Sequence, residues 1–138
     1  MRLHPHTLIV GDRPTAENAH QEVAFVGTKS YRALLRWIGA MDLDLHMVTL
    51  VNAFNSDGSP RFIEHHLGLC PCVIALGNAA AKRLTKDYPG VRFFTLPHPS
   101  GLNRHNNDEI FLKRALRDCK KYVYSTVGTA SGERVVAP

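Results

Sequence analysis

Four short runs of apolar and β-branched residues constrain the fold of this chain more than any other feature. They are Thr7–Val10, His46–Val51, Cys72–Leu76 and Val91–Leu96. Each run is four to six residues long and is followed by a glycine, an asparagine or a proline. This pattern is typical of buried parallel strands that end in functional loops. We therefore expect four strands, mainly parallel, in one sheet.

Helical patterns lie between and after these runs. The segment Tyr31–Ile38 has apolar residues on one face, and Asn78 is placed to cap a second helix that runs through Leu84. The last helix is the clearest, and we expect it from about residue 107 or 108 to Tyr124. Its predicted apolar face comprises Ile110, Phe111, Leu112, Ala115, Leu116, Cys119 and Tyr122. We interpret its lysines and arginines as a solvated face.

This alternation predicts a three-layer α/β/α sandwich around a four-stranded, mainly parallel central sheet. In open parallel sheets, ligands bind beyond the carboxyl ends of the strands. Asp12, Asn52 and His98 follow the first, second and fourth apolar runs. We therefore expect these three residues to converge on one crevice, although they are far apart in the sequence.

The size and charge of the chain fit a single soluble domain that can bind a polyanion. The 138 residues include 17 Lys and Arg against 12 Asp and Glu, which gives a formal net charge of +5. This charge permits nucleic-acid binding but is also common in ordinary soluble proteins. No stretch approaches the roughly 20 apolar residues that span a bilayer, so we expect no membrane partner. We expect a cytoplasmic monomer, with a domain over residues 1–124 and a flexible tail over 125–138.

The loop from His98 to Arg104 carries an imidazole, a hydroxyl, an apolar side chain and a guanidinium on a tight Pro/Gly turn. A protein that acts on a buried DNA base has to grip phosphates, fill the base stack and stabilise charge on the extruded base. Ser100 and Arg104 can contact the backbone, and Leu102 can fill the gap. The predicted DNA contacts are Pro99, Ser100, Gly101, Leu102 and Arg104. The alternative interpretation is a polar surface loop after a strand.

Several motifs, taken together, resemble those of the uracil-DNA glycosylase superfamily. They are Gly11–Pro14, Phe25–Gly27, Val51–Asn52, Ala75–Ala80 and His98–Ser100, and the resemblance covers about residues 7–124. It is closest to the thermophile-type enzymes, in which a Gly-Glu-Ala-Pro-Gly loop precedes Pro-Phe-Val-Gly at the same spacing. The last loop combines the His-Pro-Ser of uracil-specific members with the Pro-Ser-Gly-Leu of mismatch-specific members. The chain therefore resembles a divergent branch.

The resemblance implies a base-binding site made of Phe25, Asn52 and Thr15. Phe25 matches the aromatic residue that stacks on the flipped base, with a core residue as the alternative. Asn52 matches the amide that reads a pyrimidine edge, with a turn residue after a strand as the alternative. Thr15 occupies the position where uracil-specific members carry a bulky Tyr that collides with a 5-methyl group. The smaller side chain indicates that 5-substituted pyrimidines are accepted.

The resemblance also implies two catalytic residues. His98 matches the histidine that stabilises negative charge on the O2 of the base, although it can also be an ordinary histidine at a strand end. Asp12 stands where the family has a carboxylate that orients water or offsets positive charge on the sugar. The alternative for Asp12 is a loop cap or a partner of Arg13. Leu102 falls at the position of the intercalating wedge.

The sequence departs from the thermophile-type enzymes in its cysteines. Those enzymes hold an iron-sulfur cluster with four cysteines, whereas this chain has three, Cys70, Cys72 and Cys119. We therefore expect no cluster. Cys70 and Cys72 lie near His65 and His66, but this spacing gives poor support for zinc. We assign neither a metal nor a cofactor.

Three classes of function fit the residues. The first is a monofunctional DNA glycosylase that flips uracil or a 5-substituted uracil out of DNA and hydrolyses its N-glycosidic bond. The second is a catalytically weak or inactive module on the same scaffold that recognises modified DNA or binds another protein. The third is an α/β nucleotide-binding protein, which we rank low because no P-loop or dinucleotide fingerprint is present.

Overall fold

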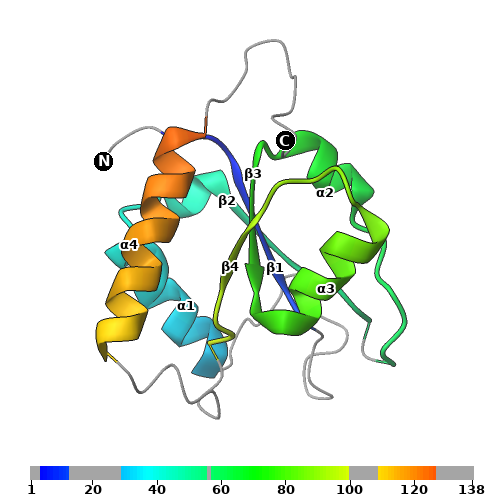
Figure 1. Cartoon of the computed structure of the whole chain (residues 1–138), viewed down its shortest axis with the longest axis horizontal. Helices are drawn as coiled ribbons and strands as arrows, with labels where there is room; N and C mark the ends of the chain where they lie inside the picture. The colour runs from blue at the N-terminus through cyan, green and yellow to red at the C-terminus, as the bar shows by residue number, and fades with distance from the viewer. Residues whose placement is uncertain (1–3, 13–28, 56, 100–108, 127–138) are drawn as a thin grey trace.

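Strands and helices alternate along the chain, as the sequence pattern predicts (Figure 1). The computed structural model describes residues 4–12, 29–55, 57–99 and 109–126. The strands are β1 (Thr7–Gly11), β2 (Val48–Asn52), β3 (Cys72–Leu76) and β4 (Phe94–Leu96). The α-helices are α1 (Lys29–Ala40), α2 (Glu64–Leu69), α3 (Gly77–Asp87) and α4 (Glu109–Ser125), and a 3₁₀-helix, Leu45–Met47, precedes β2.

The four strands form one sheet in the order β2-β1-β3-β4, and every neighbouring pair is parallel. Gly11 of β1 lies opposite Asn52 of β2, and Leu76 of β3 lies opposite Leu96 of β4. All four strands therefore end at the same edge of the sheet. This arrangement confirms the predicted α/β fold and shows that the described sheet is entirely parallel.

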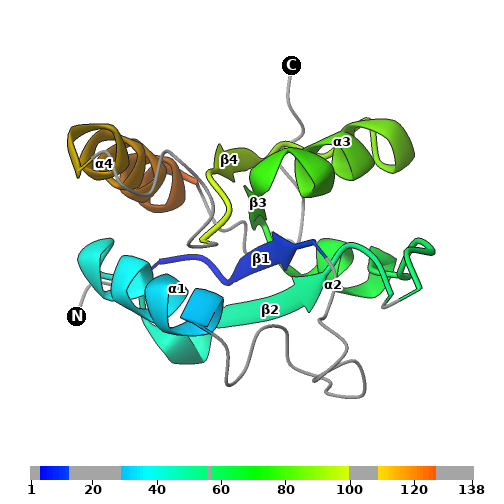
Figure 2. The same cartoon turned by 90° about the horizontal axis from the view of Figure 1, so that it is seen from below.

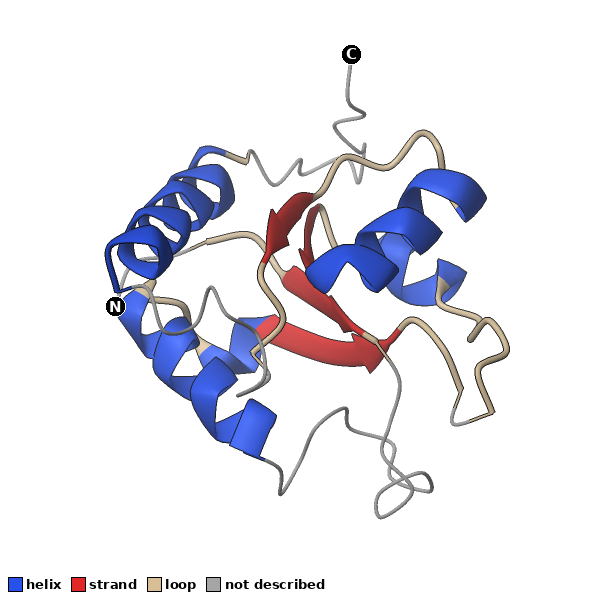
Figure 3. Ribbon diagram, turned by 60° about the horizontal axis from the view of Figure 1, so that its bottom comes forward, coloured by secondary structure: helices blue, strands red, loops and turns tan. Residues whose placement is uncertain are grey.

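Helices cover both faces of the sheet, which gives the three predicted layers (Figures 2 and 3). Helices α1 and α4 pack on one face, while α2 and α3 pack on the other. Alternate residues of each strand enter the two cores, because successive side chains of a strand point to opposite faces. In β1, for example, Ile9 belongs to the α1/α4 core and Leu8 and Val10 belong to the α2/α3 core.

Strand β4 begins at Phe94, later than the predicted start at Val91, because a side chain takes over the first hydrogen bonds of the ladder. The hydroxyl of Tyr122 accepts a hydrogen bond from the Val73 N–H at 3.2 Å. The same hydroxyl donates to the carbonyl oxygen of Arg92 at 3.5 Å. A tyrosine from α4 therefore joins β3 to the chain before β4, and regular pairing starts at Ile74 and Phe94.

Strand β2 begins at Val48, two residues after the predicted start at His46. The Asp44 side chain accepts a hydrogen bond from the His46 N–H at 3.0 Å, and the Asp44 carbonyl oxygen accepts one from the Met47 N–H at 2.8 Å. These bonds hold the preceding residues in a 3₁₀ turn, which competes with an extended conformation.

Two helix predictions need correction at the helix starts. Asn78 does not cap α3, because the helix begins directly at Gly77 with Leu76 as its N-cap, and Asn78 is exposed in the first turn. Ile110 and Phe111 do not belong to the core, since 67% and 41% of their surfaces are exposed. The first turn of α4 lies near the carboxyl end of the sheet, where Phe111 lines a cavity with the residues that follow β4 (Figure 1).

Helix α4 continues through Ser125, which is the first residue of the predicted tail. Residues 127–138 of that tail lie outside the described residues. Among the described helices, none is both long and apolar enough to cross a bilayer.

Candidate functional site

The carboxyl edge of the sheet carries the three polar residues that the strand pattern singled out. Asn52 is the last residue of β2, Asp12 directly follows β1, and His98 lies two residues after the end of β4. The parallel topology thus puts residues from three strands at one edge, where open α/β sheets bind their ligands.

Asn52 lies on the α1/α4 side of the sheet, since the adjacent Val51 belongs to the α2/α3 core and side chains alternate along a strand. Its surface is only 4% exposed. The residue opposite Asn52 on β1 is Gly11, which has no side chain. No side chain of β1 therefore stands directly opposite the buried amide.

The amide oxygen of Asn52 has an unusual environment. It is buried, and it has no hydrogen-bond partner among the described residues. An unsatisfied buried acceptor costs about 1–3 kcal/mol, so such groups are rare in folded proteins. A donor supplied by a bound molecule would remove this cost.

Backbone hydrogen bonds join the exits of β1 and β2. The Ala53 N–H donates to the Gly11 carbonyl oxygen at 2.8 Å, and the Phe54 N–H donates to the Asp12 carbonyl oxygen at 2.9 Å. The parallel pairing thus continues beyond the last residue of each strand. Asp12 and Asn52 are held in fixed relative positions, and the Asp12 side chain is half-buried.

His98 lies close enough to Asp12 for the two side chains to interact electrostatically. Burial lowers the pKa of His98 below its ordinary value of 6.5, and the negative charge of Asp12 partly opposes this shift. The net direction favours a neutral imidazole at neutral pH. A neutral imidazole can donate a hydrogen bond without transferring a proton.

Gly77 sets the position of His98 from the neighbouring strand. It has a φ of +85°, and a Cβ at this position would lie 3.1 Å from the Cβ of His98. The backbone after β4 can therefore pass close to the junction of β3 and α3 only because this residue is glycine.

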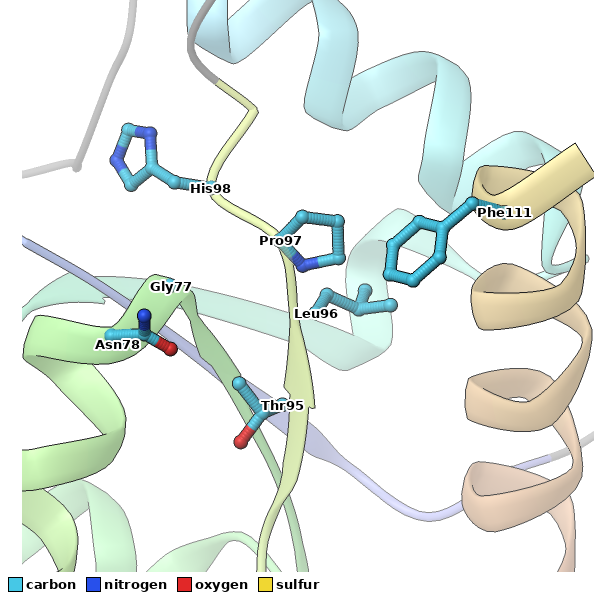
Figure 4. Close-up of a pocket in the computed structure, with 7 residues that line it drawn as sticks. All are labelled: Gly77, Asn78, Thr95, Leu96, Pro97, His98 and Phe111. Atoms are coloured by element: carbon cyan, nitrogen blue, oxygen red, sulfur yellow. The ribbon is translucent and has the colours of Figure 1, made fainter. Parts of the chain in front are cut away.

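A cavity of about 320 Å³ opens beside this junction (Figure 4). The residues that line it are Gly77, Asn78, Thr95, Leu96, Pro97, His98 and Phe111. In Figure 4 the ring of Phe111 faces Pro97, while the imidazole of His98 extends away on the other side of the chain. Sequence reasoning assigned Phe111 to the core and missed this position, since its spacing matches the apolar face of α4.

The remaining predicted site residues are only partly covered by the structure. Pro99 is buried beside His98. The predicted base-binding residues Thr15 and Phe25 lie outside the described residues, as do Ser100, Gly101, Leu102 and Arg104 of the predicted DNA-binding loop.

The three cysteines do not fit an iron-sulfur cluster. All are free and buried, with Cys70 in the α2/α3 core and both Cys72 and Cys119 in the α1/α4 core. Burial raises the pKa of Cys72 to about 11 and also raises the pKa of Cys119, which disfavours the thiolate form that binds iron. Within the described part of the chain, no three His, Cys, Asp or Glu side chains are grouped as metal ligands.

Comparison with known proteins identifies the family of the chain. A search of curated proteins gave no match. The family model described as "Uracil DNA glycosylase superfamily" matches residues 2–120, which include all four strands and most of α4. The chain therefore belongs to the uracil DNA glycosylase superfamily.

Proposed function

We propose that this member of a DNA glycosylase superfamily is a monofunctional enzyme that excises uracil or a 5-substituted uracil from DNA. The observation that carries the proposal is the arrangement at the carboxyl edge of the sheet. The buried amide oxygen of Asn52, which has no hydrogen-bond partner among the described residues, lies at the same edge as Asp12 and His98, whose side chains interact electrostatically. Membership of the superfamily supports DNA as the partner.

Asn52 reads the base in this proposal. Its buried Oδ1 accepts a hydrogen bond from the N3–H of a flipped uracil, and its amide nitrogen donates to O4. Cytosine offers no N3–H and presents an amino group in place of O4, so both contacts fail. A site whose buried polar groups are left unpaired by the wrong substrate rejects that substrate strongly.

His98 and Asp12 support cleavage of the N-glycosidic bond. The bond breaks with its electron pair moving to the base, so negative charge develops on O2 and positive charge develops on the sugar. A neutral His98 donates a hydrogen bond to O2 as this charge grows. The Asp12 carboxylate stabilises the cationic sugar or orients the water that adds to it.

The residues outside the described ranges complete the proposal through the family resemblance alone. Phe25 stacks on the flipped base, and Thr15 leaves room for a 5-substituent. Leu102 fills the vacated space in the duplex, and the other loop residues contact the backbone. The chemistry above needs no cofactor.

The experiment that tests this function is base release from defined oligonucleotides. Single strands and duplexes that contain uracil, thymine, 5-hydroxymethyluracil or no lesion are incubated with the protein, and abasic sites are then cleaved. We expect strand scission that depends on the lesion and falls roughly 100-fold in His98→Ala. His46→Ala is the matched control, because His46 is an exposed histidine away from the site. Binding without scission on every substrate would contradict the enzyme and favour the non-catalytic DNA reader.

A further inference from the structure

Arg83 is a buried cation in the middle of α3. Only 7% of its surface is exposed, and the helix packs on the opposite face of the sheet from the Asn52 side chain. Burying a guanidinium is costly, and an apolar side chain of similar size would fill the space at lower cost. The arrangement calls for a role beyond packing.

The guanidinium of Arg83 is held in one orientation by several contacts. Its Nε donates to Oδ2 of Asp87 at 3.1 Å, and its Nη2 donates to the hydroxyl of Tyr88 at 3.2 Å. That hydroxyl in turn donates to Oε1 of Glu64 on α2 at 3.2 Å. The guanidinium carbon also lies 5.9 Å from the ring centre of Phe54 and 5.5 Å from that of Tyr88.

The remaining contact of Arg83 reaches the site. Its Nη1 donates to the carbonyl oxygen of Ala53, the residue that directly follows Asn52. The same oxygen accepts the Arg61 N–H at 3.0 Å. Because the Ala53 N–H also donates to Gly11, hydrogen bonds hold the peptide units on both sides of the Ala53 Cα, and the first of these units joins Ala53 to Asn52.

We propose that Arg83 is a positioning residue for base selection, which acts by fixing the Ala53 carbonyl and thereby the direction of the Asn52 side chain. This inference rests on the proposed function of Asn52. Hydrogen-bond recognition needs its groups placed to within a fraction of an ångström, and a displacement of 1 Å can lower a rate roughly 100-fold. Arg83 touches no substrate and is effective only through Asn52.

A double-mutant cycle separates this role from a purely structural one. Single-turnover rates of uracil release are measured for the wild type, Arg83→Met, Asn52→Ala and the double variant, at a temperature well below every melting transition. We expect Arg83→Met to lower the rate roughly 10- to 100-fold. The double variant should be no slower than Asn52→Ala, because Arg83 has nothing left to position. If the rate loss of the double variant equals the product of the two single losses, the proposal is overturned.

Two further variants keep the test interpretable. Lys82→Met removes the neighbouring cation of α3, whose side chain is exposed, and should leave the rate unchanged. Arg83→Lys retains a charged donor and should recover part of the lost rate if Arg83→Met folds poorly. If Arg83→Lys is as slow as Arg83→Met at equal folded fraction, positioning requires the several donors of the guanidinium and not its charge alone. The rate losses of Arg83→Lys and Asn52→Ala must then also fail to multiply in the double variant, and losses that multiply would overturn the proposal.

A readout without catalysis separates the failure of this inference from the failure of the proposed function. The side-chain amide protons of Asn52 are followed by ¹⁵N–¹H spectroscopy in the wild type and in Arg83→Met. If the wild type releases no base, the proposed enzyme is wrong, but a displaced or broadened Asn52 signal in Arg83→Met still supports positioning. An Asn52 signal that is unchanged in Arg83→Met would overturn the positioning role of Arg83.

Discussion

At the scale of single residues, the role proposed for Asn52 combines a cost to the fold with a use in recognition. Its Oδ1 is buried without a partner among the described residues, so the folded state loses the hydrogen bonds that water would supply. This cost is about 1–3 kcal/mol for a neutral group. It is recovered when a donor enters the site, which makes Asn52 more complementary to a bound base than to the empty site.

Asn52→Ala should therefore separate stability from activity. Removal of an unsatisfied acceptor offsets part of the packing that the substitution loses, so we expect the free energy of unfolding to change by about 1 kcal/mol or less. Uracil release should slow roughly 10- to 1000-fold, because up to two buried hydrogen bonds to the base are lost. Chemical denaturation and single-turnover assays measure the two effects. A large loss of stability with unchanged base release would mean that Asn52 serves the fold.

His98 makes stability depend on pH in a predictable direction. Unfolded His98 titrates near its ordinary pKa of 6.5, and burial lowers the pKa of the folded form. As the pH falls below about 6.5, the unfolded chain binds more protons than the folded chain, so the folded state loses stability. Above about 6.5 the imidazole is neutral in both states and contributes no slope.

We expect Tm to fall more steeply between about pH 7.5 and about pH 5 in the wild type than in His98→Gln. Gln keeps a hydrogen-bonding side chain but does not titrate. His46→Gln, which changes an exposed histidine, should follow the wild type. Parallel curves for wild type and His98→Gln would show that His98 is protonated equally easily in both states.

At the scale of elements, the junction between β3 and α3 controls the approach of the chain after β4. Gly77 has a φ of +85°, which residues with a side chain adopt only with strain. A Cβ added to Gly77 would lie 3.1 Å from the Cβ of His98. The direct passage from strand to helix therefore depends on one glycine, and so does the position of His98.

Gly77→Ala should destabilise the protein and displace His98. We expect a loss of about 1–3 kcal/mol from the left-handed backbone and the close contact, together with slower uracil release. Gly39→Ala in α1 is the matched control, since nothing lies within 4 Å of its added Cβ. That change should be neutral or stabilise the helix by up to about 1 kcal/mol. Thermal unfolding of both variants tests the contrast, and equal effects would contradict it.

The β3 bounds Cys72–Leu76 are predicted correctly, because a short apolar run between turn residues has one simple interpretation. The shortened β4 could not be predicted, since it depends on the Tyr122 hydroxyl from a distant helix. The edge location of Asp12, Asn52 and His98 follows from parallel topology, which the alternation of elements indicates.

Arg83 shows why the rest of the candidate site could not be predicted. In a helical pattern, an arginine that directly follows a lysine is usually solvated, and nothing local marks this one as buried. Its role depends on the carbonyl oxygen of Ala53, 30 residues earlier in the chain. Phe111 shows the opposite case, because its spacing indicates the core while the end of the sheet leaves it exposed beside the cavity.

At the scale of the whole molecule, one cluster of positive charge lies near the end of α4. Arg117, Lys120 and Lys121 line a second cavity of about 480 Å³ with Tyr124 and Ser125 near the end of α4. Tyr124 contacts the His4 ring, ahead of β1, so this basic end of α4 lies away from the carboxyl edge of the sheet (Figure 1). Charge there adds to the net +5 but is far from His98.

The salt dependence of DNA binding should therefore distinguish a contact made by the predicted DNA-binding loop from a contact made by the basic end of α4. Each phosphate contact adds about 0.9 to the slope of log Kobs against log salt concentration, so loss of one contact lowers the slope by about 1. We expect this change for Arg104→Ala, whose residue belongs to the predicted DNA-binding loop. Lys121→Ala removes the same charge from the far end of α4 and should leave the slope unchanged. Fluorescence anisotropy with a uracil-containing oligonucleotide at several salt concentrations measures both. A reduced slope in Lys121→Ala with no change in Arg104→Ala would place the DNA along α4 and move the binding surface away from the carboxyl edge of the sheet.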